Sequence, residues 1–199
     1  MVTEQMREQE IPIIDGAPEA DPALLKLAGA PNTAPETLAA LAESNDVFVR
    51  ATVAQNPNTP PETLEKLLRE ALREGGSVSV ADQAAGNASL PESTMRRIAL
   101  LQVEGARAAV ALNPSLPEDL VQTLAKDPSP KVRGMIAWRK DTSPELLTEL
   151  SRDEHPRVRY HVVKNEATPK EVIRTLLEDD DPEIRWIAKR LLDTCANEQ

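Results

Sequence analysis

The most constraining feature of this chain is a short phrase that recurs six times at nearly constant spacing. Each copy opens with Ser or Thr, carries proline in its middle and ends on Glu. The prolines stand at 35, 61, 91, 117, 144 and 169, so successive copies begin roughly 25–30 residues apart, a period typical of solenoid proteins. One such unit cannot bury its apolar face alone, so neighbouring units must stack.

Each copy predicts the start of a helix. Ser or Thr followed three residues later by Glu forms a capping box, in which the hydroxyl accepts a main-chain N–H of the first turn. Proline is tolerated there because the donor it lacks has no partner within the helix. The six boxes begin at Thr33, Thr59, Ser89, Ser115, Thr142 and Thr168. Apolar residues follow at helical spacing, as with Leu147 and Leu150. We call this first helix of each unit segment A.

A second phrase lies between the boxes and predicts another helical segment, B. It reads Val49-Arg50 followed by Val53-Ala54, and it recurs around Arg107, Arg133, Arg159 and Arg185. The small residues of this phrase allow close approach of neighbouring units. The pattern is short enough for either an α-helix or a 3₁₀-helix.

These patterns predict an all-α solenoid of about six helix–turn–helix units, roughly 26 residues each. We expect a disordered lead-in over residues 1–22 and a single helical-repeat domain over residues 23–199. Ala23 to Ala28 resembles a B segment without its A partner, as expected of a terminal cap. Glu74 to Ser77 is expected to be a loosened A–B loop.

The stretch from Val49 to Leu64 reads Val-Arg-Ala-Thr-Val-Ala-Gln-Asn-Pro-Asn-Thr-Pro-Pro-Glu-Thr-Leu and resembles the leucine-rich repeat variant family. More distantly, the chain is similar to HEAT-like repeat proteins. The resemblance covers residues 23 to 192 and implies a right-handed superhelix of alternating α and short 3₁₀ segments. Some family members carry an N-terminal cysteine cluster that binds iron–sulfur. The one cysteine here, Cys195, cannot supply it, so no cofactor is expected.

The net charge of −10 opposes nonspecific attraction to nucleic acid or to an anionic membrane. Neither a signal peptide nor an apolar run of membrane-spanning length is present in the sequence, so we expect a cytoplasmic protein. The charge is uneven, however. Residues 1–130 hold 10 Lys or Arg against 19 Asp or Glu, whereas residues 131–199 hold 13 against 14.

Five arginines share one position in segment B and are predicted to align along the stack. They are Arg50, Arg107, Arg133, Arg159 and Arg185. Such a row could bind phosphates. The interpretation we favour is structural, because an aspartate stands six residues before each of the last three and could bond its guanidinium. Each A segment also begins with its own Glu, which repels an incoming anion.

A candidate partner-binding patch lies in the C-terminal third, where large aromatic residues replace the small ones of earlier units. Trp, Tyr and Arg dominate protein–protein hot spots. The patch comprises Trp138, Arg157, Tyr160, His161, Trp186 and Lys189. For Trp186 alone, covering the end of the stack is the favoured alternative.

The sequence offers no catalytic set and no metal-ligand spacing; His155 and His161 are six residues apart without a third ligand. We therefore expect a non-catalytic protein–protein interaction module, monomeric, whose partner the sequence does not identify. The alternative is a HEAT-like nucleic-acid-binding protein that uses the arginine row, including a glycosylase-type enzyme with an aromatic-lined site. Acidic charge and occupied helix starts make nucleic acid the weaker choice.

Overall fold

The computed structural model describes residues 21–73 and 78–196. These two stretches contain 13 α-helices and one 3₁₀-helix, and no strand lies within them. The prediction of an all-α solenoid is confirmed. The predicted lead-in over residues 1–22 falls outside the described residues as far as residue 20. The described residues begin with Asp21, whose carboxylate accepts the main-chain N–H of Ala23 and caps the first helix.

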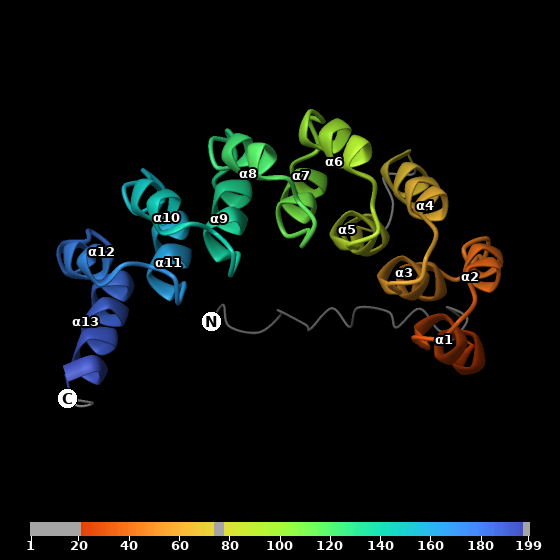
Figure 1. Cartoon of the computed structure of the whole chain (residues 1–199), viewed down its shortest axis with the longest axis horizontal. Helices are drawn as coiled ribbons and strands as arrows, with labels where there is room; N and C mark the ends of the chain where they lie inside the picture. The colour runs from red at the N-terminus through yellow and green to blue at the C-terminus, as the bar shows by residue number, and fades with distance from the viewer. Residues whose placement is uncertain (1–20, 74–77, 197–199) are drawn as a thin grey trace, which may run out of the picture.

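Six A helices form the outer row of an arch, as Figure 1 shows. Each begins at one of the recurring phrases. They are α2 (Pro35–Leu41), α4 (Pro61–Arg73), α6 (Glu92–Ala99), α8 (Glu118–Leu124), α10 (Pro144–Leu150) and α12 (Lys170–Thr175). The last is continued by the 3₁₀-helix η1 (Leu176–Glu178).

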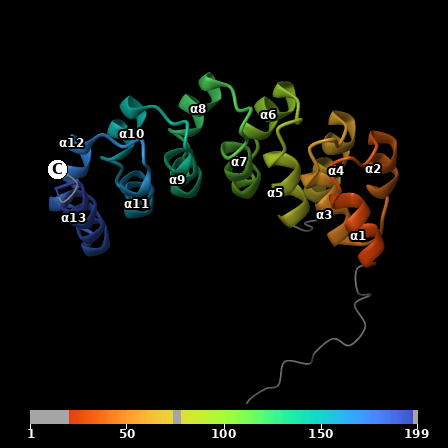
Figure 2. The same cartoon turned by 60° about the horizontal axis from the view of Figure 1, so that its bottom comes forward.

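The B helices form the inner row, with each helix beside the next (Figures 1 and 2). They are α1 (Pro22–Gly29), α3 (Val47–Gln55), α5 (Val78–Gly86), α7 (Glu104–Ala111), α9 (Pro130–Trp138), α11 (Pro156–Lys164) and α13 (Pro182–Ala196). Segment B is therefore an α-helix in every described unit, which resolves the choice that the sequence leaves open. Helix α1 has no A partner among the described residues, in keeping with a cap.

The core runs continuously between the two rows. From the outer row, fully buried leucines such as Leu38, Leu64 and Leu147 point inward. The inner row contributes valines and small residues, with Ala54 and Ala111 completely buried. Small side chains on B allow adjacent inner helices to approach closely, while leucines fill the wider space towards A. The opposite, exposed side of each B helix therefore lines the inside of the arch.

The helix starts show a stricter repeat than the prolines do. The A helices begin at positions 35, 61, 92, 118, 144 and 170, so four of the five intervals between them are identical. The one longer interval contains residues 74–77, and the loop predicted there lies outside the described residues. Proline is the first helical residue in α2, α4 and α10, but Pro91, Pro117 and Pro169 are N-caps.

The predicted capping boxes are wrong in their hydrogen bonds, although the helices begin where expected. The Thr59, Thr142 and Thr168 hydroxyls are buried and donate to main-chain carbonyls six residues earlier, at the end of the preceding B helix. Thr33 does the same to Leu27. The Ser89 and Ser115 hydroxyls donate to carbonyls of the previous unit. The threonine hydroxyls thus close the B-to-A turn, and the serine hydroxyls join it to the previous unit. All six lie one or two residues before the N-cap, too early to reach the free N–H groups of helix A.

Among the five A helices whose N-caps the structure describes, a side-chain cap is present in α10, where the Ser143 hydroxyl accepts the N–H of Leu146 at 3.2 Å. Its counterpart in α2 is Ala34, which offers no side-chain acceptor. Capping by side chains is therefore a property of single units here and not of the repeat.

Candidate functional site

Three of the five repeat arginines form bidentate ion pairs between successive units. Nε and Nη2 of Arg107 donate to the two carboxylate oxygens of Asp127 at 2.7 and 3.0 Å. Arg133 binds Asp153 at 2.6 and 2.8 Å in the same way. Arg159 binds Asp179 at 2.7 and 2.8 Å. We call these pairs the arginine ladder.

The carboxylate partner differs from the one that the sequence suggests. The sequence pairs Arg133 with the side chain of Asp127, six residues earlier, but that carboxylate belongs to Arg107. What Asp127 offers Arg133 is its main-chain carbonyl, which accepts from Nη1 at 2.9 Å. Each guanidinium therefore joins the turn before its own helix to the aspartate of the next unit, and the ladder connects units instead of closing each one.

Charge pairing holds these aspartates ionised. The Arg159 guanidinium, opposed by burial, lowers the pKa of Asp179 from its ordinary value. For Asp153, burial alone would raise the pKa, but the hydrogen bonds from Arg133 and from the N–H of His155 outweigh it and lower it. The ladder pairs are also nearly buried; the side chains of Arg107 and Asp127 are 10% and 5% exposed. Guanidinium groups held in this way have no free edge for a phosphate.

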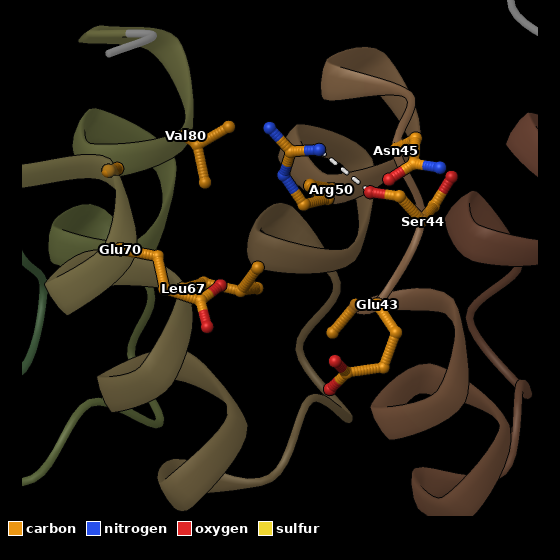
Figure 3. A pocket seen from close by; sticks show the side chains of 9 residues that line it. Glu43, Ser44, Asn45, Arg50, Leu67, Glu70 and Val80 are labelled. Atoms are coloured by element: carbon orange, nitrogen blue, oxygen red, sulfur yellow. Dashed lines mark hydrogen bonds between the residues drawn. The ribbon is translucent and has the colours of Figure 1, made fainter. Parts of the chain in front are cut away.

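The arginines at either end of the row lack a carboxylate partner among the described residues. Arg185 in α13 donates Nη1 to the carbonyl of Asp179. Arg50 donates Nη1 to the carbonyl of Ser44 at 2.7 Å. Figure 3 shows the Arg50 guanidinium entering a hollow of about 350 Å³ that Glu43 and Glu70 also line. Those two carboxylates make this hollow unsuited to an anion.

A second series of inter-unit bonds, made by asparagines at the end of the B helices, is absent from the sequence-based predictions. The Asn113 side-chain amide donates to the carbonyls of Ala85 and Asn87 at 2.7 and 2.8 Å. Asn56, Asn87 and Asn165 make the same pair of bonds to the unit before. The recurrence of asparagine shortly before several A helices is the sequence signal for these bonds. It was overlooked because an Asn-Pro pair, as at Asn56 and Asn113, is also typical of a turn that ends a helix.

Arg139 occupies the asparagine position in one unit. Its Nη1 donates to the carbonyls of Ala111 and Asn113 at 2.8 and 2.6 Å. Its Nη2 binds Asp141, while its buried Nε has no hydrogen-bond partner among the residues that the structure describes. The longer side chain thus reproduces the asparagine bonds at the cost of one unsatisfied donor.

Three of the six candidate patch residues lie together on adjacent inner helices. The His161 ring packs edge-on against Trp138, with centroids 5.5 Å apart, and against Tyr160 at 5.7 Å. The His161 ring can pack at this position because Gly134 has no side chain, and a Cβ there would lie 3.0 Å from the ring. Burial, with the nearby Arg157 charge adding to it, lowers the pKa of His161. At neutral pH the imidazole is therefore uncharged and is part of the aromatic cluster.

Trp186 lies on the next inner helix, α13. Its ring is 57% exposed, and the guanidinium of Arg190 lies over it at 4.9 Å. Trp138 is 49% exposed, so both indoles present a large apolar surface to solvent. Arg157 and Lys189 are exposed on α11 and α13.

Three further cations, Lys131, Lys164 and Arg190, lie on the same side of α9, α11 and α13. The sequence analysis missed them because the sequence alone does not show which side of each B helix is left uncovered by its neighbours. None of the resulting five cations forms an ion pair with a carboxylate of the described residues. Glu183 is an exposed acidic residue on α13. We define the inner basic surface as Lys131, Trp138, Arg157, Tyr160, His161, Lys164, Trp186, Lys189 and Arg190.

Hollows accompany this surface. One of about 390 Å³ lies between α5 and α9, where Gly105, Ala108 and Ala109 leave room over α7 and where Asp82 and Lys131 both line the hollow. A smaller one of about 170 Å³ lies between Trp138 and Lys164. Small or flat side chains next to cations can accept both the apolar and the acidic side chains of a ligand.

The histidines do not form a metal site in the part of the chain that the structure describes. The His155 Nδ1 accepts the N–H of Arg157 at 3.2 Å and caps α11. Over residues 21–73 and 78–196 no group of three His, Cys, Asp or Glu is placed to hold a metal ion. Within the same stretches, every helix is too short or too polar to cross a bilayer.

No curated protein matches the chain. A similar solved structure is described as "a leucine-rich repeat variant with a novel repetitive protein structural motif"; it is 24% identical, with a TM-score of 0.35. The match covers 84% of this chain and 79% of that one. The sequence profile of the family described as leucine rich repeat variant matches residues 47–71, which span α3 and most of α4. The resemblance to the leucine-rich repeat variant family that Val49 to Leu64 predicted is therefore confirmed over residues 47–71.

Proposed function

We propose that the chain is a non-catalytic protein-interaction module that binds an acidic segment of a partner protein on the inner basic surface. The observation that carries this proposal is the grouping of exposed indoles with unpaired cations on α9, α11 and α13, in a protein whose net charge is −10. Aromatic anchors surrounded by charged side chains are typical of binding hot spots. The local positive charge attracts acidic segments, while the remaining surface repels them.

Nucleic acid is the less favoured ligand. Its case depended on the repeat arginines, and Arg107, Arg133 and Arg159 are bound to aspartates. The five cations of the inner basic surface lie on the same helices as its two indoles, which suits a short peptide more than a phosphate backbone.

The test compares proteins captured from a host lysate by the wild type and by Arg157→Glu/Lys164→Glu, with and without nuclease. Both positions are exposed on the inner row. The matched control is Lys126→Glu/Arg152→Glu, which makes the same charge change after the outer helices α8 and α10. Chemical cross-links from each captured protein are then located by mass spectrometry.

We expect a partner that survives nuclease, is lost with the inner variant, is retained by the outer control and cross-links through acidic residues to α9 or α11. A partner captured equally by both variants would place binding elsewhere and overturn the proposal. Capture that disappears with nuclease would favour nucleic acid instead.

A further inference from the structure

The segment that precedes Asp21 and α1, residues 1–20, has a composition complementary to the inner basic surface. It contains five acidic residues against one arginine, Arg7. Three of the acids, Glu4, Glu8 and Glu10, come first, and the apolar stretch Ile11-Pro-Ile-Ile14 follows. An acidic stretch next to an apolar one is the kind of ligand that the inner basic surface and its neighbouring hollow would take.

The order of features on the inner row is the same as their order along this segment. The hollow over α7, lined by Gly105, Ala108 and Ala109 with Asp82 of α5 at its edge, is nearer to α1 along the inner row than the cations of α11 are. The cations of α9 and α11 come next, beginning with Lys131. Going back along the chain from Asp21, the isoleucines are likewise met before the three glutamates.

The lengths agree as well. Adjacent packed helices are about 10 Å apart, so α7 is about 30 Å from α1 and α11 about 50 Å. An extended chain advances about 3.3 Å per residue. Ile11 to Ile14 therefore reach about 23–33 Å from Asp21, at the hollow. Glu10 to Glu4 reach about 36–56 Å, over α9 and α11.

We propose that residues 1–20 are a ligand of the chain's own inner basic surface, with Ile11–Ile14 at the hollow over α7 and Glu4, Glu8 and Glu10 against the cations of α9 and α11. This inference rests on the proposed function, since it names an occupant for the same surface. Tethering gives the segment an effective concentration in the millimolar range, so even weak binding covers the surface much of the time. An external acidic partner must then displace it, which makes the segment a competitive inhibitor in cis.

The two tryptophans of the chain, Trp138 and Trp186, both lie on this surface, so intrinsic fluorescence reports on it without a label. We would measure acrylamide quenching of the full chain against two variants, Glu4→Lys/Glu8→Lys/Glu10→Lys and Ile13→Asp/Ile14→Asp. The control, Glu36→Lys/Glu145→Lys/Glu149→Lys, makes the same charge change as the first variant on the outer helices α2 and α10.

We expect the quenching constant to rise by roughly a third or more in both segment variants and to stay unchanged in the control, because the segment covers Trp138 on α9 about half of the time or more in the wild type, whereas Trp186 on α13 lies beyond its reach. Carbodiimide should also link Glu8 or Glu10 to Lys131 or Lys164 within monomers at low protein concentration. Equal quenching in all four proteins, or no such link, would overturn the proposal. Links found only in dimers, increasing with concentration, would assign the surface to a second copy and also overturn it.

This experiment needs no external partner, so its result is separate from that of the lysate test. If quenching is unchanged in the segment variants but a captured partner is lost with Arg157→Glu/Lys164→Glu, the intramolecular ligand is contradicted and the interaction module is supported. If quenching shows that residues 1–20 cover the surface but no partner is captured from the lysate, the proposed interaction module is contradicted and the intramolecular ligand is supported.

Discussion

Each ladder aspartate holds three segments of chain at once. The Asp153 carboxylate binds Arg133 of the preceding unit and accepts the N–H of His155 in its own turn. The carbonyl of Asp153 accepts from Arg159 of the following inner helix. Removal of one such side chain therefore leaves a nearly buried guanidinium without its counter-charge, which is far more costly than the loss of a surface ion pair.

We predict that Asp153→Asn lowers the free energy of unfolding by about 3 kcal/mol at pH 7. Because the pKa of Asp153 is lowered in the folded state, its contribution is full above the unfolded pKa of about 3.9 and is lost as the pH falls through the folded value. The difference in the free energy of unfolding between wild type and variant should therefore become smaller below a pH of about 4. Urea unfolding at several pH values measures both effects.

Glu154→Gln is the control for this prediction. Glu154 lies 3.8 Å from Arg133 but its side chain is 91% exposed, so the change should cost less than about 0.5 kcal/mol. An equal cost for the two substitutions, or a difference that persists at low pH, would contradict the ladder's contribution to stability.

At the scale of single elements, the start of helix A depends on two adjacent residues with different tasks. Thr142 donates to the carbonyl of Ile136 and fastens the end of α9, while Ser143 caps α10. In α2 the cap position is Ala34, which provides no acceptor.

We predict that removing the cap of α10 and adding a cap to α2 change the free energy of unfolding in opposite directions. Ser143→Ala should destabilise the protein by about 1 kcal/mol, and Ala34→Ser should stabilise it by about 0.5–1 kcal/mol. Thermal and urea unfolding of the two variants check this. If Thr142 were the cap, as a capping box would have it, Ser143→Ala would be nearly neutral.

The same elements show what the sequence could and could not predict. The helix starts were predictable because Ser or Thr, Pro and Glu recur together at each one. The exact register was not, since proline fits both the N-cap and the first helical position, as Pro91 and Pro144 illustrate. The arginine partner was ambiguous because Arg133 and Arg159 each have an aspartate six residues before them and another twenty residues after them. Asp127, for example, precedes Arg133 in the same unit and follows Arg107 of the unit before.

The inner basic surface could be foreseen only in part. Tyr160 and Trp186 drew attention because small residues hold their position in earlier units, and His161 is brought to Trp138 only by packing between units. Lys131 and Lys164 gave no sequence signal, because a lysine in an amphipathic helix is usual. Their importance comes from the arch, which places the exposed sides of successive B helices next to one another.

At the scale of the whole molecule, the arginine ladder is uneven. It is complete from α7 to α13, but Arg50 has no carboxylate partner among the described residues and α5 carries Ala81 at the arginine position. In a stacked array, local stability depends on the interfaces with the neighbouring units. The units around α3 and α5 should therefore open more readily than those around α9 and α11.

We predict that native-state hydrogen exchange is at least about tenfold faster for the amides of α3 and α5 than for those of α9 and α11. Mass spectrometry of peptides from each helix measures it. Arg133→Gln should abolish the difference by raising exchange in α9 and α11. Uniform protection in the wild type would show that the asparagine bonds alone set the stability of the stack.

Both series of inter-unit bonds keep a fixed sequence separation, 20 residues for the arginine–aspartate pairs and 26 and 28 residues for the Asn113 bonds, and four of the five A-helix intervals are equal. A duplication or deletion of one whole unit anywhere from α6 to α12 would leave each donor facing an equivalent acceptor. Such a gene can change its length by whole units while it keeps the same rules of assembly. The length of the arch, and with it the length of the peptide-binding surface proposed above, would then change during evolution in steps of one repeat unit.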